Sequence, residues 1–308
     1  MSSPQDQGKD IRFKRILIAT DFSDASRNAL RYAAAIARHH GARLYIVHVV
    51  SSVGYRMVGA DVEVKAAELA ARDLRELWSK LGGADESRRV ELALFVRIGD
   101  VCHQLEELIQ KELIDLVVVG TRGRTGVSKV MLGSVAEDIF RKVSCPVLTV
   151  GPNSAWDWPQ REVGAEKVIL FATDFGDAAF KALPYAVSIA NRSRSKLILL
   201  HVATPILQAD TTPIFGQPLD RIEEEIRTAS QQRLAELIPE DPQLESELRV
   251  KRGLPVDAIL GEASRSAAGL IVLGLHRKSL LVPSGHLPST TIYGVVVAAK
   301  CPVLTVRT

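Results

Sequence analysis

The chain contains few of the residues that mark specialised classes of protein. Of its 308 residues only 3 are cysteines and 5% are aromatic, and the cysteines lie far apart, at Cys102, Cys145 and Cys301. Without a Cys-x-x-Cys pair, neither a disulfide framework nor a zinc site is expected, and the reducing cytoplasm is the expected location. Because aromatic residues are sparse, Val, Leu, Ile and Ala must build the cores.

Long apolar runs and an excess of one charge are also missing. No apolar run approaches the ~18 residues that a membrane-spanning helix requires, and the first ten residues are too polar for a secretory signal. The 39 basic and 36 acidic residues are interspersed and leave a net charge of +3. We therefore expect neither a membrane nor a nucleic acid as a partner.

The chain does have an internal repeat. Residues 14–50 and 167–203 are identical at 18 of 37 positions without a gap, and both halves close on Cys-Pro-Val-Leu-Thr-Val, at 145–150 and 301–306. A period of about 150 residues is too long for a solenoid. The repeat predicts two copies of one domain, at 13–152 and 166–308, with a polar tail at 1–12 and a linker at 153–165.

Each copy alternates between two hydrophobic patterns. Short apolar runs predict buried strands, which in the first copy cover 16–19, 44–49, 90–96, 114–119 and 146–150. Amphipathic stretches predict helices, one that begins near Ser23 as its N-cap and others at 62–81, 100–111 and 134–142. This alternation predicts an α/β fold with two tandem, doubly wound, Rossmann-like domains, each built on a five-stranded parallel sheet.

Candidate ligand-binding residues gather where the strands of such a sheet end, since ligands bind beyond their carboxyl ends. Asp21 directly follows the first strand, and the fourth strand leads into Gly120-Thr-Arg-Gly-Arg-Thr-Gly126. Gly133-Ser134 then precedes a helix, whose start offers free N–H groups and a positive dipole end to an anion. Glycines let the main chain approach a phosphate closely, and Arg122 and Arg124 can pair with its charge.

The alternative interpretation is that these glycines only end strands and form turns. The convergence of Asp21, the glycine-rich loop and the helix start on one rim favours a ligand site, in which Asp21 would accept a hydrogen bond from a ribose hydroxyl or a base. The loop is not a Walker A motif, because Gly-Lys-Ser/Thr is absent. It is not a Rossmann fingerprint either, because no G-x-G-x-x-G follows the first strand.

These residues resemble the universal stress protein family, in particular its tandem members. The resemblance rests on Ala19-Thr-Asp-Phe-Ser23, His48-Val49, the spacing Gly120-x2-Gly123-x9-Gly133-Ser134 and the closing segment 145–150. It covers nearly the whole chain, and it implies a fold like that of the adenine nucleotide alpha hydrolases. One departure is Ala19, where members of the family often carry proline.

The resemblance also implies that the first copy binds ATP, with Mg²⁺ or Mn²⁺ bridging the phosphates and no metal ligand assigned to the protein. The residues implied for the adenosine half are Ala19, Thr20, Asp21 and Val49. Those implied for the phosphates are Gly120, Arg122, Gly123, Arg124, Gly133, Ser134 and Val135.

The second copy departs from the glycine spacing. It keeps Asp174 and Val202 in the places of Asp21 and Val49, but Arg277 stands where Gly123 does, and Ser289-Thr290 replaces Gly133-Ser134. A side chain at the position of Gly123 would crowd a phosphate. We therefore expect weak or absent nucleotide binding in the second copy, with a different anion as the alternative.

By resemblance, the favoured function is a stress-response regulator in which ATP changes conformation, assembly or the choice of an unknown protein partner. No residue resembles a water-activating carboxylate beside the loop, so at most slow ATP hydrolysis is expected. The alternatives are an ATP-using enzyme that transfers adenylyl or phosphoryl groups and a ligand-free scaffold.

Two further expectations concern the ends of strands. The closing apolar strands at 146–150 and 302–306 are expected at sheet edges, where unpaired main-chain groups invite pairing. The resemblance implies that these edges pair the two copies as an internal pseudo-dimer, and two chains are expected to form a homodimer. His48 and His201 share one place in the two copies, at the end of the second strand. We expect a structural hydrogen bond from them and not catalysis.

Overall fold

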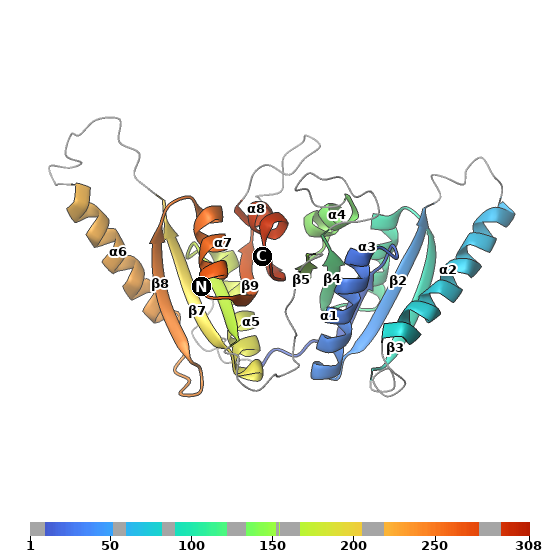
Figure 1. Ribbon diagram of the computed structural model, residues 1–308, viewed down its shortest axis with the longest axis horizontal. Helices are drawn as coiled ribbons and strands as arrows, with labels where there is room; N and C mark the ends of the chain where they lie inside the picture. Colours follow the sequence, from blue (N-terminus) through green and yellow to red (C-terminus); the bar gives the residue numbers. More distant parts are fainter. Residues whose placement is uncertain are drawn as a thin grey trace. The chain divides into compact units, whose positions relative to one another are not determined.

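The computed structural model describes residues 10–51, 60–81, 90–121, 134–151, 154, 167–204, 219–276 and 291–308. The chain divides into two compact units. The N-terminal unit comprises residues 12–162 and 300–305, and the C-terminal unit comprises residues 1–11, 163–299 and 306–308. Figure 1 labels the helices and strands of both units. In the described part of the chain, no helix is long and apolar enough to cross a membrane.

Strands and helices alternate strictly along the N-terminal unit. Its elements are β1 (Arg15–Ala19), α1 (Asp24–His40), β2 (Arg43–Ser51), α2 (Ala60–Leu81), β3 (Leu92–Gly99), α3 (Val101–Lys111), β4 (Leu116–Gly120), α4 (Ser134–Lys142) and β5 (Val147–Val150). The five strands are parallel, in the order β3-β2-β1-β4-β5. The first residues of β10 (Val303–Arg307) pair antiparallel with β5, Val303 facing Thr149.

Local sequence explains where these elements begin and end. Ile16, Leu17 and Ile18 are fully buried in β1, as expected of a strand covered on both faces. Ser23 caps α1, and its side chain accepts a hydrogen bond from the Ser26 N–H at 3.2 Å. The helix ends at Gly41, whose φ of 64° lies in the left-handed region that favours glycine.

The C-terminal unit repeats this chain order. Its elements are β6 (Val168–Thr173), α5 (Asp177–Ser193), β7 (Lys196–Ala203), α6 (Leu219–Glu236), β8 (Ser246–Arg252), α7 (Pro255–Arg265), β9 (Ala268–Leu275) and α8 (Thr291–Ala298). The strands β9, β6, β7 and β8 are neighbours in this order, and all three pairs are parallel. Their central residues are as buried as those of β1; Ile169, Leu170 and Phe171 are fully buried.

Each unit reverses its winding direction at one place in the sheet. The chain runs outward from β1 to β2 and β3 and then returns to β4 on the other side of β1. With right-handed crossovers, this return places α3 and α4 on the opposite face of the sheet from α1 and α2. The reversal leaves a crevice at the carboxyl ends of β1 and β4, and at those of β6 and β9 in the C-terminal unit.

The α/β fold with doubly wound, mostly parallel sheets is confirmed, and so is the pairing of the two closing strands, at 147–149 and 303–305. One strand was placed wrongly: the run at 90–96 forms β3 at Leu92–Gly99, and Asp100 caps α3 instead of lying inside it. All three cysteines are free thiols. Most of the expected linker lies outside the described residues, and the domain limits stay predictions.

Candidate functional site

Five of the residues expected to bind adenosine or phosphate lie on one rim of the N-terminal sheet. β1 ends at Ala19 and β4 ends at Gly120, and the two strands are parallel neighbours in which Ile18 faces Val118. Thr20 and Asp21 follow β1 directly. Val49 lies on β2, two residues beyond the partner of Ala19. The sheet register therefore brings these residues to the reversal point between β1 and β4.

Thr20 shapes the rim through polar groups that bind within the protein. Its side chain is buried, its N–H donates to the Val47 carbonyl at 2.9 Å, and its hydroxyl accepts from the Phe22 N–H at 3.1 Å. The Thr20 carbonyl accepts from Nδ1 of His48 at 2.8 Å. Because a carbonyl only accepts, Nδ1 of His48 carries the hydrogen. The expected structural hydrogen bond of this histidine is confirmed.

Asp21 is held at the rim by a short turn. Its Oδ1 accepts a hydrogen bond from the Ser23 N–H at 3.0 Å, and Phe22 between them has a φ of 63°. The Phe22 ring packs on the His48 ring with centroids 4.6 Å apart. The carboxylate is partly exposed where β1 ends, which is the position that a ligand at the reversal point would meet.

Gly120 has a packing role that does not depend on a ligand. A Cβ at this position would lie 2.9 Å from the main-chain carbon and oxygen of Ala25 in the first turn of α1. Glycine at the end of β4 therefore allows α1 to approach the sheet closely. In the C-terminal unit a Cβ at Gly274 would lie only 2.2 Å from the main chain of Ala178 on α5, so the same contact recurs.

The other residues expected to bind the phosphates lie wholly or partly outside what the structure describes. Arg122, Gly123, Arg124 and Gly133 lie outside the described residues. Ser134 and Val135 form the start of α4, as expected, but their side chains are not described. Among the described residues, no group of three or more His, Cys, Asp or Glu side chains could hold a metal ion.

The C-terminal unit builds the same turn from its own residues. Nδ1 of His201 donates to the Thr173 carbonyl at 2.9 Å, which confirms the second expected histidine contact. Oδ1 of Asp174 accepts from the Gly176 N–H at 2.8 Å. Phe175 has a φ of 61°, and its ring lies 4.4 Å from that of His201. The turn is thus common to both repeats.

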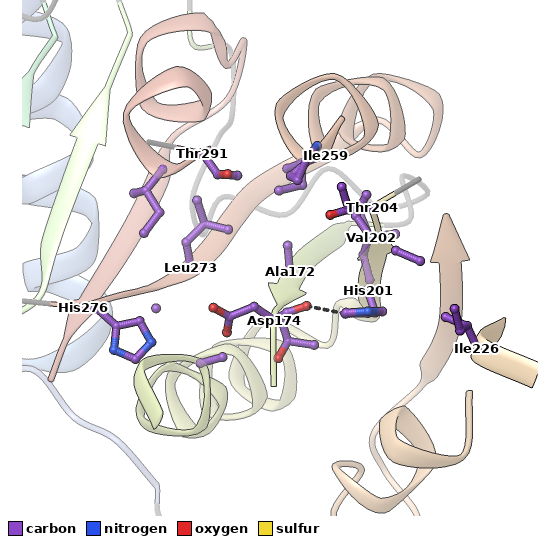
Figure 2. Close-up of a pocket in the computed structure, with 17 residues that line it drawn as sticks. Ala172, Asp174, His201, Val202, Thr204, Ile226, Ile259, Leu273, His276 and Thr291 are labelled. Atoms are coloured by element: carbon purple, nitrogen blue, oxygen red, sulfur yellow. Dashed lines mark hydrogen bonds between the residues drawn. The ribbon is translucent and has the colours of Figure 1, made fainter. Parts of the chain in front are cut away.

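A cavity of about 630 Å³ opens above this second turn (Figure 2). It lies at the carboxyl ends of β6 and β9, with Asp174, His201 and His276 in its lining, and α6 and α7 contribute Ile226 and Ile259. From the sequence we expected weak or absent nucleotide binding in this copy, and no local pattern indicated the cavity, because its described lining comes from seven separate helices and strands.

His276, which follows β9, is the other histidine of the lining. In the structure, Nε2 of His276 lies 2.9 Å from where a Cβ at residue 176 would be. Gly176 therefore leaves the space that the imidazole occupies. In the first repeat, Ser23 and Arg122 occupy the corresponding positions of the sequence.

The fold defines a tandem α/β protein in which each repeat reverses its strand order at one place, with the same aspartate turn beside the reversal. A family model described as the universal stress protein family matches residues 12–151 and again 166–307. The chain therefore belongs to the universal stress protein family, as a tandem member.

Individual relatives agree with this assignment. A universal stress protein of Mycolicibacterium smegmatis is 27% identical over 301 residues, which are 95% of this chain and 96% of that protein. One from Methanocaldococcus jannaschii is 33% identical over 141 residues, which are 45% of this chain and 82% of that protein. The crystal structure of a universal stress protein from Archaeoglobus fulgidus has the same fold, with a TM-score of 0.68 at 18% identity; the match covers 96% of this chain and 99% of that one.

Proposed function

We propose that the protein is a cytoplasmic stress-response regulator that binds ATP in its N-terminal unit. Bound ATP would change the conformation of the protein, its dimeric assembly or its choice of a protein partner. The observation that carries the proposal is the Asp21 carboxylate, which a turn holds at the reversal point of the sheet. Ligands of doubly wound sheets bind at this point, and a carboxylate there is suited to accept hydrogen bonds from ribose hydroxyls.

The residues of the rim fit the adenosine half of ATP. Asp21 would accept hydrogen bonds from the ribose, while Ala19 and Val49 would supply apolar contact beside the ring. Thr20 would position Asp21, because its own polar groups bind within the protein. Gly120 would contribute through its main chain at the end of β4, since the space of its missing side chain is taken by α1.

The phosphate half of the proposal rests on the sequence. Gly123 and Gly133 would let the main chain approach the phosphates, Arg122 and Arg124 would pair with their charge, and the start of α4 at Ser134 would face them with Val135. A bound Mg²⁺ or Mn²⁺ would neutralise part of the phosphate charge.

Calorimetric titration of the full chain with ATP and Mg²⁺ tests the proposal. Asp21→Ala should weaken binding by about 1–3 kcal/mol, roughly 5- to 150-fold, because the ribose loses its acceptor. Asp73→Ala is the control, since it removes an exposed carboxylate of α2 away from the rim and should leave ATP affinity unchanged. Equal affinity of wild type and Asp21→Ala would exclude the assigned site.

A second pair of measurements separates the regulator from the alternatives. Gly123→Val should abolish ATP binding and leave the circular dichroism spectrum unchanged, because the loop was assigned for steric access and not for packing. Multiple-turnover release of ADP at rates typical of enzymes, about 1 s⁻¹ or faster, would contradict a regulatory role and favour an ATP-using enzyme. No ATP binding at all would favour a scaffold.

A further inference from the structure

The cavity of the C-terminal unit has a lining that disfavours polyphosphates. Its walls are largely aliphatic, with Ile226, Ile259 and Leu273 among them, and no Lys or Arg occurs among the described residues that line it. Its titratable members are Asp174 and two histidines (Figure 2). Asp174 therefore places a full negative charge at the cavity that no described lining cation offsets.

The polar lining is rich in hydrogen-bond acceptors. The Asp174 carboxylate is acceptor-only when ionised. His201 donates through Nδ1 to the Thr173 carbonyl, so Nε2 is the acceptor of its neutral ring. A ligand that satisfies both groups must bring hydroxyl or amino donors.

One feature of the lining favours a ligand atom that carries a partial negative charge. Thr291 and Ile292, the first residues of α8, line the cavity. A helix start carries about +0.5 of an elementary charge, which is less than the full charge of Asp174. The described lining is therefore net negative, and the start of α8 can meet a single acceptor atom of a ligand without favouring a polyanion.

The contact between Gly176 and His276 distinguishes this cavity from the N-terminal rim. In the sequence, Ser23 and Arg122 of the first repeat stand at the positions of Gly176 and His276. The second repeat thus has a histidine in place of an arginine, and the imidazole lies against the main chain of Gly176 at the start of α5.

We infer that this cavity binds an uncharged ligand of about nucleoside size that donates hydrogen bonds to Asp174 and His201, and that it rejects polyphosphates. Its volume of about 630 Å³ lies within the range usual for small-molecule sites. The aliphatic walls would cover a flat ring, and the acceptors would meet its hydroxyl or amino groups. The inference does not depend on ATP binding by the N-terminal unit.

The test is a calorimetric titration of the full chain with adenosine, performed in excess ATP and Mg²⁺. Adenosine is uncharged and carries both kinds of donor, whereas ATP is its polyanionic counterpart. We expect adenosine to bind in spite of the ATP. Ile226→Trp should weaken this binding at least tenfold by filling the cavity, and because Ile226 is 37% exposed the larger side chain can be accommodated without disturbing the fold.

Asp174→Asn provides a second, gentler change. The amide oxygen can still accept from the Gly176 N–H, so the turn is kept while the charge is removed. We expect weaker adenosine binding and measurable entry of ATP. The control is Asp73→Asn, which removes an exposed carboxylate of α2 away from both rims and should leave the adenosine titration in excess ATP unchanged.

Three results would overturn the inference. These are no binding of adenosine, adenosine binding that neither Ile226→Trp nor Asp174→Asn affects, and competition by ATP for the site that Ile226→Trp blocks. A failure of the proposed ATP function looks different, because ATP would then bind nowhere while adenosine binding would still respond to Ile226→Trp.

Discussion

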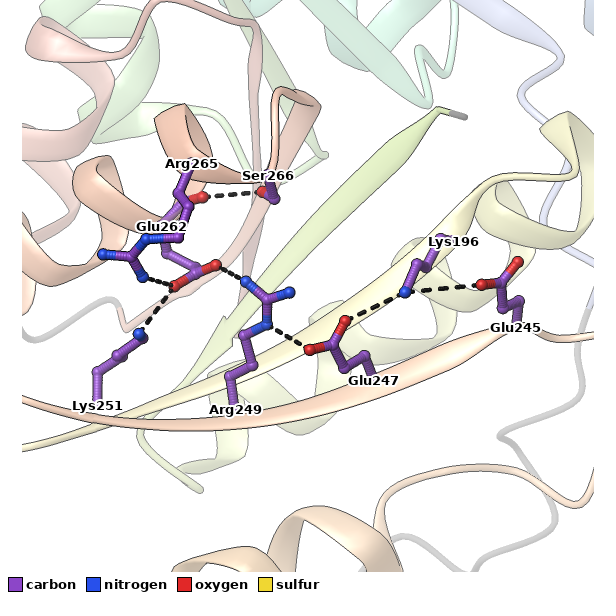
Figure 3. A network of polar contacts seen from close by, with 8 residues as sticks. All are labelled: Lys196, Glu245, Glu247, Arg249, Lys251, Glu262, Arg265 and Ser266. Carbon is purple, nitrogen blue, oxygen red and sulfur yellow. Dashed lines mark hydrogen bonds and ion pairs between the residues drawn. The ribbon is translucent and has the colours of Figure 1, made fainter. Parts of the chain in front are cut away.

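Replacing Glu262 with glutamine should destabilise the C-terminal unit by about 2–3 kcal/mol. The Glu262 side chain lies on α7 and is completely buried, with a relative exposure of 0%. Its two carboxylate oxygens bind Arg249 and Lys251 of β8 and Arg265 of its own helix (Figure 3). These pairs tie α7 to β8, so the charge of a single carboxylate links two elements.

The magnitude follows from the exposure of the three cations. Removing one partner of a buried ion pair typically costs about 3–5 kcal/mol, because a charge is left buried and unpaired. Here Lys251 and Arg265 are 37% and 61% exposed and can turn to water. Arg249 is 25% exposed and keeps its contact with Glu247 at 2.7 Å. The expected loss of stability for Glu262→Gln is therefore smaller than is usual for breaking a buried ion pair.

Native-state hydrogen exchange of peptides from β8 and α7 is the suitable assay, because the three tryptophans, at 78, 156 and 158, all precede the second repeat. Glu76→Gln, at an exposed pair with Lys80 on α2, is the control and should cause no resolvable change in its own peptides. A loss below about 0.5 kcal/mol for Glu262→Gln would refute the assignment of a linking role to this carboxylate.

The first repeat suggests how the stability lost on replacing Glu262 can be recovered. Aligning Gly99 with Gly253 places Leu108 at the position of Glu262 and Phe95 at that of Arg249. Leu108 is buried at the corresponding place on α3. Replacing buried ion pairs with well-packed apolar residues is often neutral or stabilising. The double variant Arg249→Phe and Glu262→Leu should therefore be more stable than Glu262→Leu alone.

Three further predictions concern the same fold. Gly274→Ala should lower the thermal midpoint sharply, by the equivalent of about 3 kcal/mol, because its Cβ would overlap the main chain of Ala178. Hydrogen bonds from Arg249 and then Lys196 lower the pKa of Glu247 to about 2, so its contribution to stability is present above pH ~4.5 and is lost as the pH falls toward 2; acid titration of Glu247→Gln should show a flatter decline. Burial, followed by the contact with Asp138, raises the pKa of the Cys102 thiol to about 12. Iodoacetamide at pH 8 should therefore alkylate it roughly a thousandfold more slowly in the native protein than in urea, and comparable rates would contradict this.

Much of the fold could be predicted from the sequence because its signals are local or repeated. Ser23 predicted a helix start, since an N-cap needs only the residues that follow it. The repeat places His48 and His201 at the same position, near the end of the second strand, and this predicted a shared structural contact. Each binds the carbonyl at the end of the first strand of its repeat. These contacts depend on sheet register, which the hydrophobic pattern already fixes.

The parts that could not be predicted depend on contacts between distant segments. Gly120 was assigned to phosphate binding, and nothing in its neighbours along the chain indicated that α1 passes over it. Glu262 looks in the sequence like an ordinary helical glutamate with Arg265 three residues on, because its other two partners, Arg249 and Lys251, lie on β8 and only the folded chain brings them near. The C-terminal cavity was missed for the same reason, since the glycine spacing describes a loop and not the walls around it.

The two repeats keep one frame and differ in the residues around it. Both keep the aspartate turn and the histidine that binds behind it, so the frame of the site is held by contacts that do not involve a ligand. Differences gather at the positions beyond β4 and β9 and at the start of the following helix. There, the change from Ser23 to Gly176 makes room for His276. Because the frame is independent of these positions, the second repeat could exchange a cation for an imidazole without losing the turn that presents its carboxylate.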